Sequence, residues 1–114
     1  MTIAVDSSFC VVLTTTSSRA EAEQLAKLLV EQKLAACVQL LPIDSIYTWE
    51  NTVKQDSEVL MLIKTSKASF VSIEMLIQQH HSYQVPEIIQ LPIEQGSSAY
   101  LQWLADAVSK KTLT

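Results

Sequence analysis

Two segments of this chain are apolar at odd and even positions alike: VVL at residues 11–13 and VLMLI at residues 59–63. Successive side chains of a β-strand point to opposite faces of its sheet. A strand with one covered face alternates apolar and polar residues, and these two segments do not alternate. They therefore predict a sheet whose two faces are both shielded from water.

Three segments show the three- and four-residue apolar spacing of an amphipathic helix: residues 19–32, 66–80 and 97–110. Ser18 precedes the first of them and Glu21 follows three residues later, which is the pattern of a capping box. Each helix is expected to bury one stripe of its surface against the sheet.

Strands are expected at residues 9–15, 34–49, 52–64 and 85–93. The second and third flank Glu50 and Asn51, and asparagine tolerates the positive φ of a tight hairpin turn. Pro42 marks a bulge or an edge position in this long hairpin. Pro86 forces Val85 into an extended conformation and so opens the last strand.

The order βαββαβ with an added C-terminal helix predicts an α+β fold, a ferredoxin-like sandwich with an antiparallel sheet and helices on one face. We expect a single domain over residues 1–114, with its core at about residues 9–110. The helices of one small chain can cover one sheet face only. The second apolar face therefore predicts an oligomer packed sheet to sheet, with high thermal stability because unfolding is coupled to dissociation.

Composition and motifs argue against several functions. Eight basic and twelve acidic residues give a net charge of −4 without a basic cluster, so no nucleic-acid partner is expected. No apolar run approaches the roughly 20 residues that span a bilayer, and the N-terminus lacks a signal-peptide pattern, which predicts no membrane association and a cytoplasmic location. Gly96 is the only glycine, which excludes glycine-rich phosphate loops, and no catalytic triad or H-E-x-x-H motif indicates an enzyme.

The sulfur-containing residues lie inside apolar patterns. Cys10 and Cys37 are therefore expected to be reduced, buried thiols and not a disulfide. Met61 and Met75 occupy similar positions. All four could in principle bind copper through sulfur, but core packing is the simpler interpretation.

The segment QQHHSYQVPEII, residues 78–89, contains both histidines of the chain. Imidazole is a natural ligand of Cu(II), Zn(II) and Ni(II), which makes His80 and His81 candidate metal ligands. The alternative is that they end a helix, where an imidazolium interacts favourably with the helix dipole. Adjacent helical residues point about 100° apart, so the pair cannot easily share one ion unless the helix ends between them. A third ligand would come from Glu87 or from a neighbouring subunit.

Four separated segments carry a family resemblance: LAACVQLLPIDSIYTWEN at residues 34–51, EVLMLIKT at 58–65, HHSYQVPEIIQLPIEQG at 80–96 and YLQW at 100–103. They resemble the signature segments of the CutA family, the trimeric divalent-cation tolerance proteins, in sequence and spacing. The resemblance implies a ferredoxin-like subunit in a tight homotrimer, with extended hairpins that wrap neighbouring subunits. It also implies a cytoplasmic protein that binds copper (Cu2+) or another divalent cation weakly, with His80 and His81 as the metal ligands.

The chain departs from the family pattern at three places. Ser82 stands where the family commonly has a proline after the histidines, and Asn51 and Thr52 stand where it has Gly-Lys. Thr14 stands where some bacterial relatives carry a cysteine that is proposed as a copper ligand. A thiolate is a far better copper ligand than a hydroxyl, so this last difference bears directly on metal affinity.

An alternative function is that of a PII-type trimeric signalling or scaffold protein, which binds a small ligand or a partner at its intersubunit clefts. The candidate cleft residues are four aromatic and three charged side chains: Tyr47, Trp49, Tyr83, Trp103, Glu58, Lys64 and Glu87. Aromatic residues beside apolar strands also serve to fill subunit interfaces. Any charged group buried there would need a partner, because an unpaired buried charge is strongly destabilising.

Overall fold

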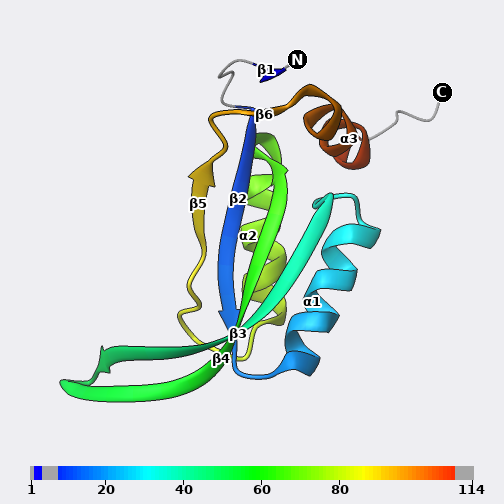
Figure 1. The fold of residues 1–114 in the computed structure, drawn as a ribbon. Coiled ribbons are helices and arrows are strands. Elements are labelled where there is room, and N and C mark those ends of the chain that lie inside the picture. Colours follow the sequence, from blue (N-terminus) through cyan, green and yellow to red (C-terminus); the bar gives the residue numbers. More distant parts are fainter. Residues whose placement is uncertain (1, 4–7, 110–114) are drawn as a thin grey trace.

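The computed structural model describes residues 2–3 and 8–109 of the chain (Figure 1). Its elements are β1 (Thr2–Ile3), β2 (Phe9–Thr16), α1 (Arg19–Glu31), β3 (Cys37–Trp49), β4 (Thr52–Ser66), α2 (Phe70–His80), β5 (Ile89–Pro92), β6 (Gly96–Ser97) and α3 (Ser98–Val108). A single 3-10 turn, Lys67–Ser69, leads into α2. Among the described residues, no helix is long and apolar enough to cross a membrane. The α+β class predicted from the sequence is confirmed.

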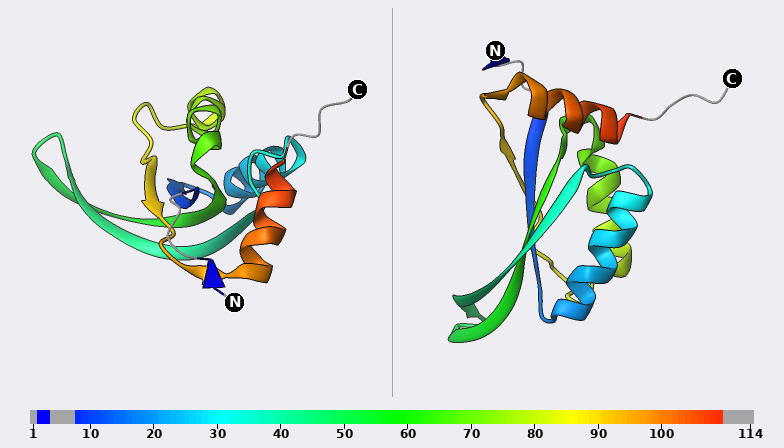
Figure 2. Two further views of the ribbon diagram at one scale, coloured as in Figure 1. Left: turned by 90° about the horizontal axis from the view of Figure 1, so that it is seen from above. Right: turned by 45° about the vertical axis from the view of Figure 1, so that its right-hand side comes forward.

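The main sheet has four antiparallel strands in the order β3-β4-β2-β5, and β1 pairs with β6 in a separate small ladder. Helices α1 and α2 lie side by side against one face of the main sheet, and α3 lies across one end of it (Figures 1 and 2). The predicted antiparallel sheet is therefore present, with its two long crossover helices on the same face.

The hairpin of β3 and β4 forms as the sequence predicts and projects well beyond the rest of the sheet (Figure 1). Its register runs without interruption from Cys37 opposite Lys64 to Trp49 opposite Thr52. Glu50 and Asn51 form the turn with φ values of 51° and 63°, the left-handed pair that matches the twist of a two-residue hairpin. Pro42 lies within this unbroken register on the edge strand, so the edge interpretation is right and there is no bulge.

Two predicted boundaries differ from the structure. The predicted strand at residues 85–93 shortens to Ile89–Pro92, the residues that pair in register with Cys10 to Leu13 of β2. Residues 82–85 form bends and residues 86–88 have no regular secondary structure, so the predicted strand start at Val85 is wrong. The C-terminal helix begins at Ser98, after Ser97 caps it by accepting a hydrogen bond of 3.3 Å from the Tyr100 amide. Lys110, the predicted end of this helix and of the core, lies outside the described residues.

The core lies between the main sheet and the pair α1 and α2. Alternate residues of β2 and β4 are fully buried there against leucines and isoleucines of the two helices: Cys10, Val12, Met61, Ile63, Leu25, Leu29, Ile73 and Ile77. Burial raises the pKa of the Cys10 thiol, which keeps it protonated. Cys37 is a half-buried free thiol, whereas Met75 is exposed on α2, so core packing was the wrong interpretation for Met75.

None of the described helices covers the other face of the main sheet over most of its length (Figures 1 and 2). Leu13, Leu60 and Leu62 point to this face and are only half-buried, and Leu41 and Leu91 are 51% and 49% exposed. The second apolar face that the non-alternating strand segments predict is therefore real. Within the single chain it is uncovered.

Thr14 is a polar residue within the core whose hydroxyl is unsatisfied in the described part of the chain. Its side chain is fully buried and its hydroxyl has no hydrogen-bond partner among the residues that the structure describes. A buried hydroxyl without a partner is destabilising. We expect Thr14→Val to raise the free energy of unfolding by about 1–2 kcal/mol, measured by chemical denaturation.

Thr65 provides the matched control for this change. It is equally buried, but its hydroxyl donates a hydrogen bond of 2.6 Å to the carbonyl oxygen of Leu34. Thr65→Val should therefore lower stability by about 1–2 kcal/mol. Equal effects of the two substitutions would contradict the assignment of an unsatisfied hydroxyl at Thr14.

Candidate functional site

The two adjacent histidines have different environments. Helix α2 ends at His80, which is exposed, and the backbone of His81 is already extended with φ of −84° and ψ of 144°. The helix therefore ends between the two residues, as sharing of one ion requires. The His81 side chain, however, is turned inward and is 0% exposed.

Both ring nitrogens of His81 are engaged in hydrogen bonds. The Tyr83 amide donates to Nδ1 over 3.0 Å, so Nδ1 is an acceptor and the ring proton sits on Nε2. Nε2 in turn donates to the carbonyl oxygen of Thr15, at the end of β2, over 2.7 Å. His81 thus fastens the loop after α2 to the sheet, and it could bind a metal ion only by giving up one of these bonds.

Ser82 and Glu21 form a second set of hydrogen bonds that hold the same loop. One carboxylate oxygen of Glu21 accepts the Ser82 amide at 2.8 Å, and the other accepts the Ser82 hydroxyl at 3.0 Å. Glu21 also lies 3.7 Å from Nδ1 of His81. A proline at position 82 has no amide hydrogen to donate. The departure from the family pattern at this residue therefore adds two hydrogen bonds between the loop and α1.

These contacts define what the histidine segment offers a metal ion. His80 presents one accessible imidazole, and His81 presents none without rearrangement. No group of three or more histidine, cysteine, aspartate or glutamate side chains is close enough to hold an ion within residues 2–3 and 8–109. The geometry fits weak binding by one exposed imidazole better than a closed site, which needs several ligands.

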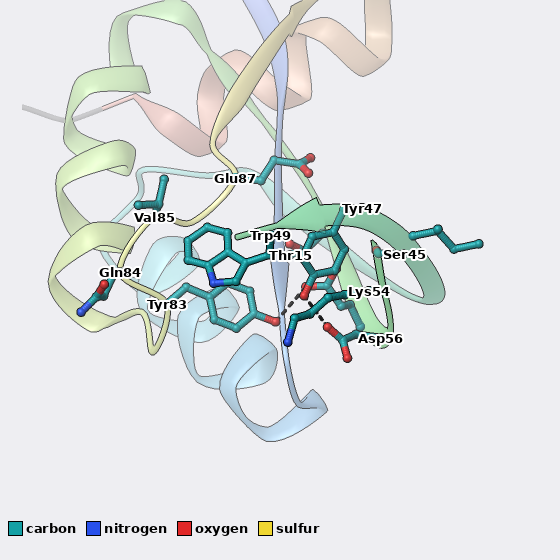
Figure 3. Close-up of a pocket in the computed structure, with 12 residues that line it drawn as sticks. Thr15, Ser45, Tyr47, Trp49, Lys54, Asp56, Tyr83, Gln84, Val85 and Glu87 are labelled. Carbon is teal, nitrogen blue, oxygen red and sulfur yellow. Dashed lines mark hydrogen bonds between the residues drawn. The ribbon is translucent and has the colours of Figure 1, made fainter. Parts of the chain in front are cut away.

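A cavity of about 820 Å³ lies between the outer half of the β3–β4 hairpin and the loop after the histidines (Figure 3). Twelve residues line it: Thr15, Ser45, Ile46, Tyr47, Trp49, Lys54, Asp56, Glu58, Tyr83, Gln84, Val85 and Glu87. Five of the seven predicted cleft residues are among them. The predicted grouping is therefore found in a single chain for Tyr47, Trp49, Glu58, Tyr83 and Glu87.

Two tyrosines in this cavity donate to carboxylates. The Tyr83 hydroxyl donates to Glu58 over 2.8 Å, and the Tyr47 hydroxyl donates to Asp56. Burial, followed by the hydrogen bond to Glu58, raises the pKa of Tyr83 far above its usual value. The hydrogen bond to Asp56 raises the pKa of Tyr47. Both phenols therefore remain neutral hydrogen-bond donors at physiological pH.

Lys64 and Trp103, the other two predicted cleft residues, do not line this cavity. The Lys64 ammonium lies 5.5 Å from the ring centroid of Tyr100, and that ring lies 5.6 Å from the ring of Trp103. This second cluster joins β4 to α3. Within one chain the seven predicted cleft residues thus divide between the cavity and the cluster that joins β4 to α3.

Sequence reasoning missed two charged residues of the cavity, Lys54 and Asp56. Lys54 pairs directly with Tyr47 across the hairpin, and Asp56 pairs with Ser45. A two-residue turn at Glu50 and Asn51 fixes this register. Counting outward from the turn would have found both residues.

Comparison with known proteins gives consistent results for most of the chain. The family description "CutA1 divalent ion tolerance protein" matches residues 10–107. A divalent-cation tolerance protein of Thermus thermophilus is 44% identical over 97 residues, covering 84% of this chain and 94% of the relative. The human protein named CutA is 46% identical over 84 residues, which are 73% of this chain and 47% of that protein. The chain thus spans about half the length of the human relative.

Solved structures agree with these sequence matches. The structure of CutA from Synechococcus elongatus has a TM-score of 0.91 at 35% identity, covering 96% of each chain. The periplasmic divalent cation tolerance protein CutA of Archaeoglobus fulgidus has a TM-score of 0.87 at 37% identity, covering 89% of this chain and 99% of the other. The similarity extends through both the sheet and the helices.

Proposed function

Because this chain belongs to the CutA1 family of divalent ion tolerance proteins, we propose that it acts in tolerance of divalent cations and binds Cu2+ weakly. The observation that carries the proposal is the family match over residues 10–107. His80 is the primary ligand in this proposal, because its imidazole is exposed. His81 contributes only when it releases Thr15 or Tyr83. No catalytic step is part of the proposed function.

The proposed working form is a homotrimer of ferredoxin-like subunits, each a single domain. The strand order β3-β4-β2-β5, with helical crossovers after β2 and β4, supports the ferredoxin-like topology. The uncovered apolar face of the sheet supports assembly. The projecting hairpin supports it further, because Ile46 and Val53 are 69% and 74% exposed there and would be covered by a neighbouring subunit.

A cytoplasmic location remains our prediction for this chain. Its two cysteines are free thiols, as a reducing compartment maintains them. The relatives differ in this respect, since the Arabidopsis protein is named chloroplastic and the Archaeoglobus protein periplasmic. The cation-tolerance function is preferred over the PII-type signalling alternative because the relatives are named for the former.

Copper titration by calorimetry tests the metal proposal. We expect weak, saturable Cu2+ binding to the wild-type protein and at least about tenfold weaker binding to His80→Ala, because the accessible imidazole is lost. Gln79→Ala, at the neighbouring exposed position of α2, is the control and should bind like the wild type. Absent binding, or binding that His80→Ala leaves unchanged, would contradict the proposal.

A further inference from the structure

We propose that Glu21 is a positioning residue that restrains His81 and so limits copper binding to the single imidazole of His80. This inference rests on the proposed copper function and adds a residue of another helix to its control. Glu21 lies in the first turn of α1, whereas the two histidines lie at the end of α2. The hydrogen bonds that carry the inference are all formed within one chain, so they do not depend on assembly.

The Glu21 side chain is directed at the loop after α2 and is only 14% exposed. One carboxylate oxygen accepts the Ser82 hydroxyl. The other accepts the Ser82 amide and lies 3.7 Å from Nδ1 of His81. Hydrogen bonds to a carboxylate are stronger than hydrogen bonds between neutral groups. Glu21 therefore fixes the direction of the peptide that joins His81 to Ser82.

A fixed peptide at this point keeps the His81 ring inside the protein. The ring is held at both nitrogens, by the Thr15 carbonyl oxygen and by the Tyr83 amide. To turn outward towards His80, the ring must leave both partners. Because the Tyr83 amide belongs to the loop that Glu21 holds, the same movement shifts the backbone of that loop. The hydrogen bonds of Glu21 therefore add to the free energy needed to release His81.

Release of His81 determines how many imidazoles a copper ion can reach. Helix α2 ends between the two histidines, so an outward His81 ring can approach the ring of His80. Two imidazoles on one chain hold Cu2+ more tightly than one. A ligand that needs a minor conformation binds with an apparent affinity that is reduced by the population of that conformation. Restraint by Glu21 therefore weakens copper binding, and loss of the restraint strengthens it.

Copper calorimetry of Glu21→Ala gives a result that a purely structural role would not. The substitution removes both acceptors of Ser82, so we expect lower stability together with Cu2+ binding about tenfold tighter than in the wild type. Ser82→Ala removes only the hydroxyl bond and should tighten binding about threefold. In a His81→Ala background, Glu21→Ala should leave copper affinity unchanged, because Glu21 acts through His81.

Glu23→Ala is the matched control on the same helix. Glu23 is 45% exposed and pairs with Arg19 over 3.6 Å, so the substitution removes the same charge from α1 without altering the bonds of Glu21. Its copper affinity should equal that of the wild type. Weaker binding in Glu21→Ala would make Glu21 a ligand and overturn the inference. Unchanged binding in Glu21→Ala, or an equal gain in the His81→Ala background, would overturn it as well.

Hydrogen exchange of the Tyr83 amide tests the same restraint without metal. This amide donates to Nδ1 of His81, so its exchange rate reports release of the ring. In NMR measurements on the assembled protein, we expect Glu21→Ala to speed this exchange about tenfold and Glu23→Ala to leave it unchanged. If neither the wild type nor any variant binds copper, the proposed copper function fails. Equal Tyr83 exchange in the wild type and in Glu21→Ala overturns the restraint itself, whatever the copper result.

Discussion

Replacing Leu62 by glutamate is expected to convert the proposed homotrimer into monomers. Leu62 lies on β4 opposite Leu13 of β2, in the middle of the uncovered face of the sheet. If that face packs against other subunits, the substitution buries an unpaired carboxylate, which destabilises the interface by at least about 3 kcal/mol per subunit. Sedimentation velocity or light scattering measures the change in mass. The subunit itself should remain folded, because Leu62 is only half-buried within one chain.

Val71→Glu is the matched control for this substitution. Val71 is 64% exposed on α2, on the helical layer and away from the open sheet face. The Val71→Glu substitution introduces the same side chain without burying it, so the proposed trimer should persist. A wild-type protein that is monomeric, or a Leu62→Glu variant with the wild-type mass, would rule out assembly through this face. A melting temperature that rises with protein concentration in the wild type, but not in the Leu62→Glu variant, would support the coupling of unfolding to dissociation.

Replacing His81 by alanine is expected to lower the free energy of unfolding by about 2–4 kcal/mol. The substitution leaves a cavity, because the side chain is 0% exposed. It also removes the partners of the Thr15 carbonyl and the Tyr83 amide, which lie on two separate segments. Denaturant titration of the assembled protein measures the loss.

The neighbouring substitution His80→Ala should change stability by less than about 0.5 kcal/mol, because this side chain is exposed. The two histidines are thus expected to separate by function: His81 affects folding, and His80 affects copper binding. Equal losses of stability in the two variants would refute the assigned roles. A His81→Ala variant that stays as stable as the wild type but loses copper binding would instead make His81 the principal ligand.

The local features of the fold follow directly from the residues. Ser18 caps α1 by accepting a hydrogen bond of 3.2 Å from the Glu21 amide, as the capping pattern predicts. Glu50 and Asn51 make the predicted turn, and the register of the hairpin follows from it. The apolar spacing identifies three helices and the principal strands. Each of these depends on interactions among residues that are near neighbours in sequence or lie on one hairpin.

The candidate site was predictable only in part, and the histidines show why. The sequence makes both imidazoles candidate metal ligands, but His81 forms a hydrogen bond to the Thr15 carbonyl oxygen 66 residues away, and no local sequence pattern predicts that contact. Ser82 takes the place of the family's usual proline, and the Glu21 carboxylate holds it through two hydrogen bonds that the sequence does not reveal. In both cases the partner comes from an element that only the packed sheet and helices bring near.

The sequence by itself determined the order of the main helices and strands, the apolar character of both sheet faces and the family, because periodicity, turns and family-like segments are properties of the chain read in order. The tertiary structure alone decided that His81 faces inward while His80 faces solvent. It also decided that Lys64 and Trp103 belong to a cluster of their own, and that Lys54 and Asp56 border the cavity. Those placements depend on how strand register and helix packing bring distant segments together, and side-chain direction follows from that packing.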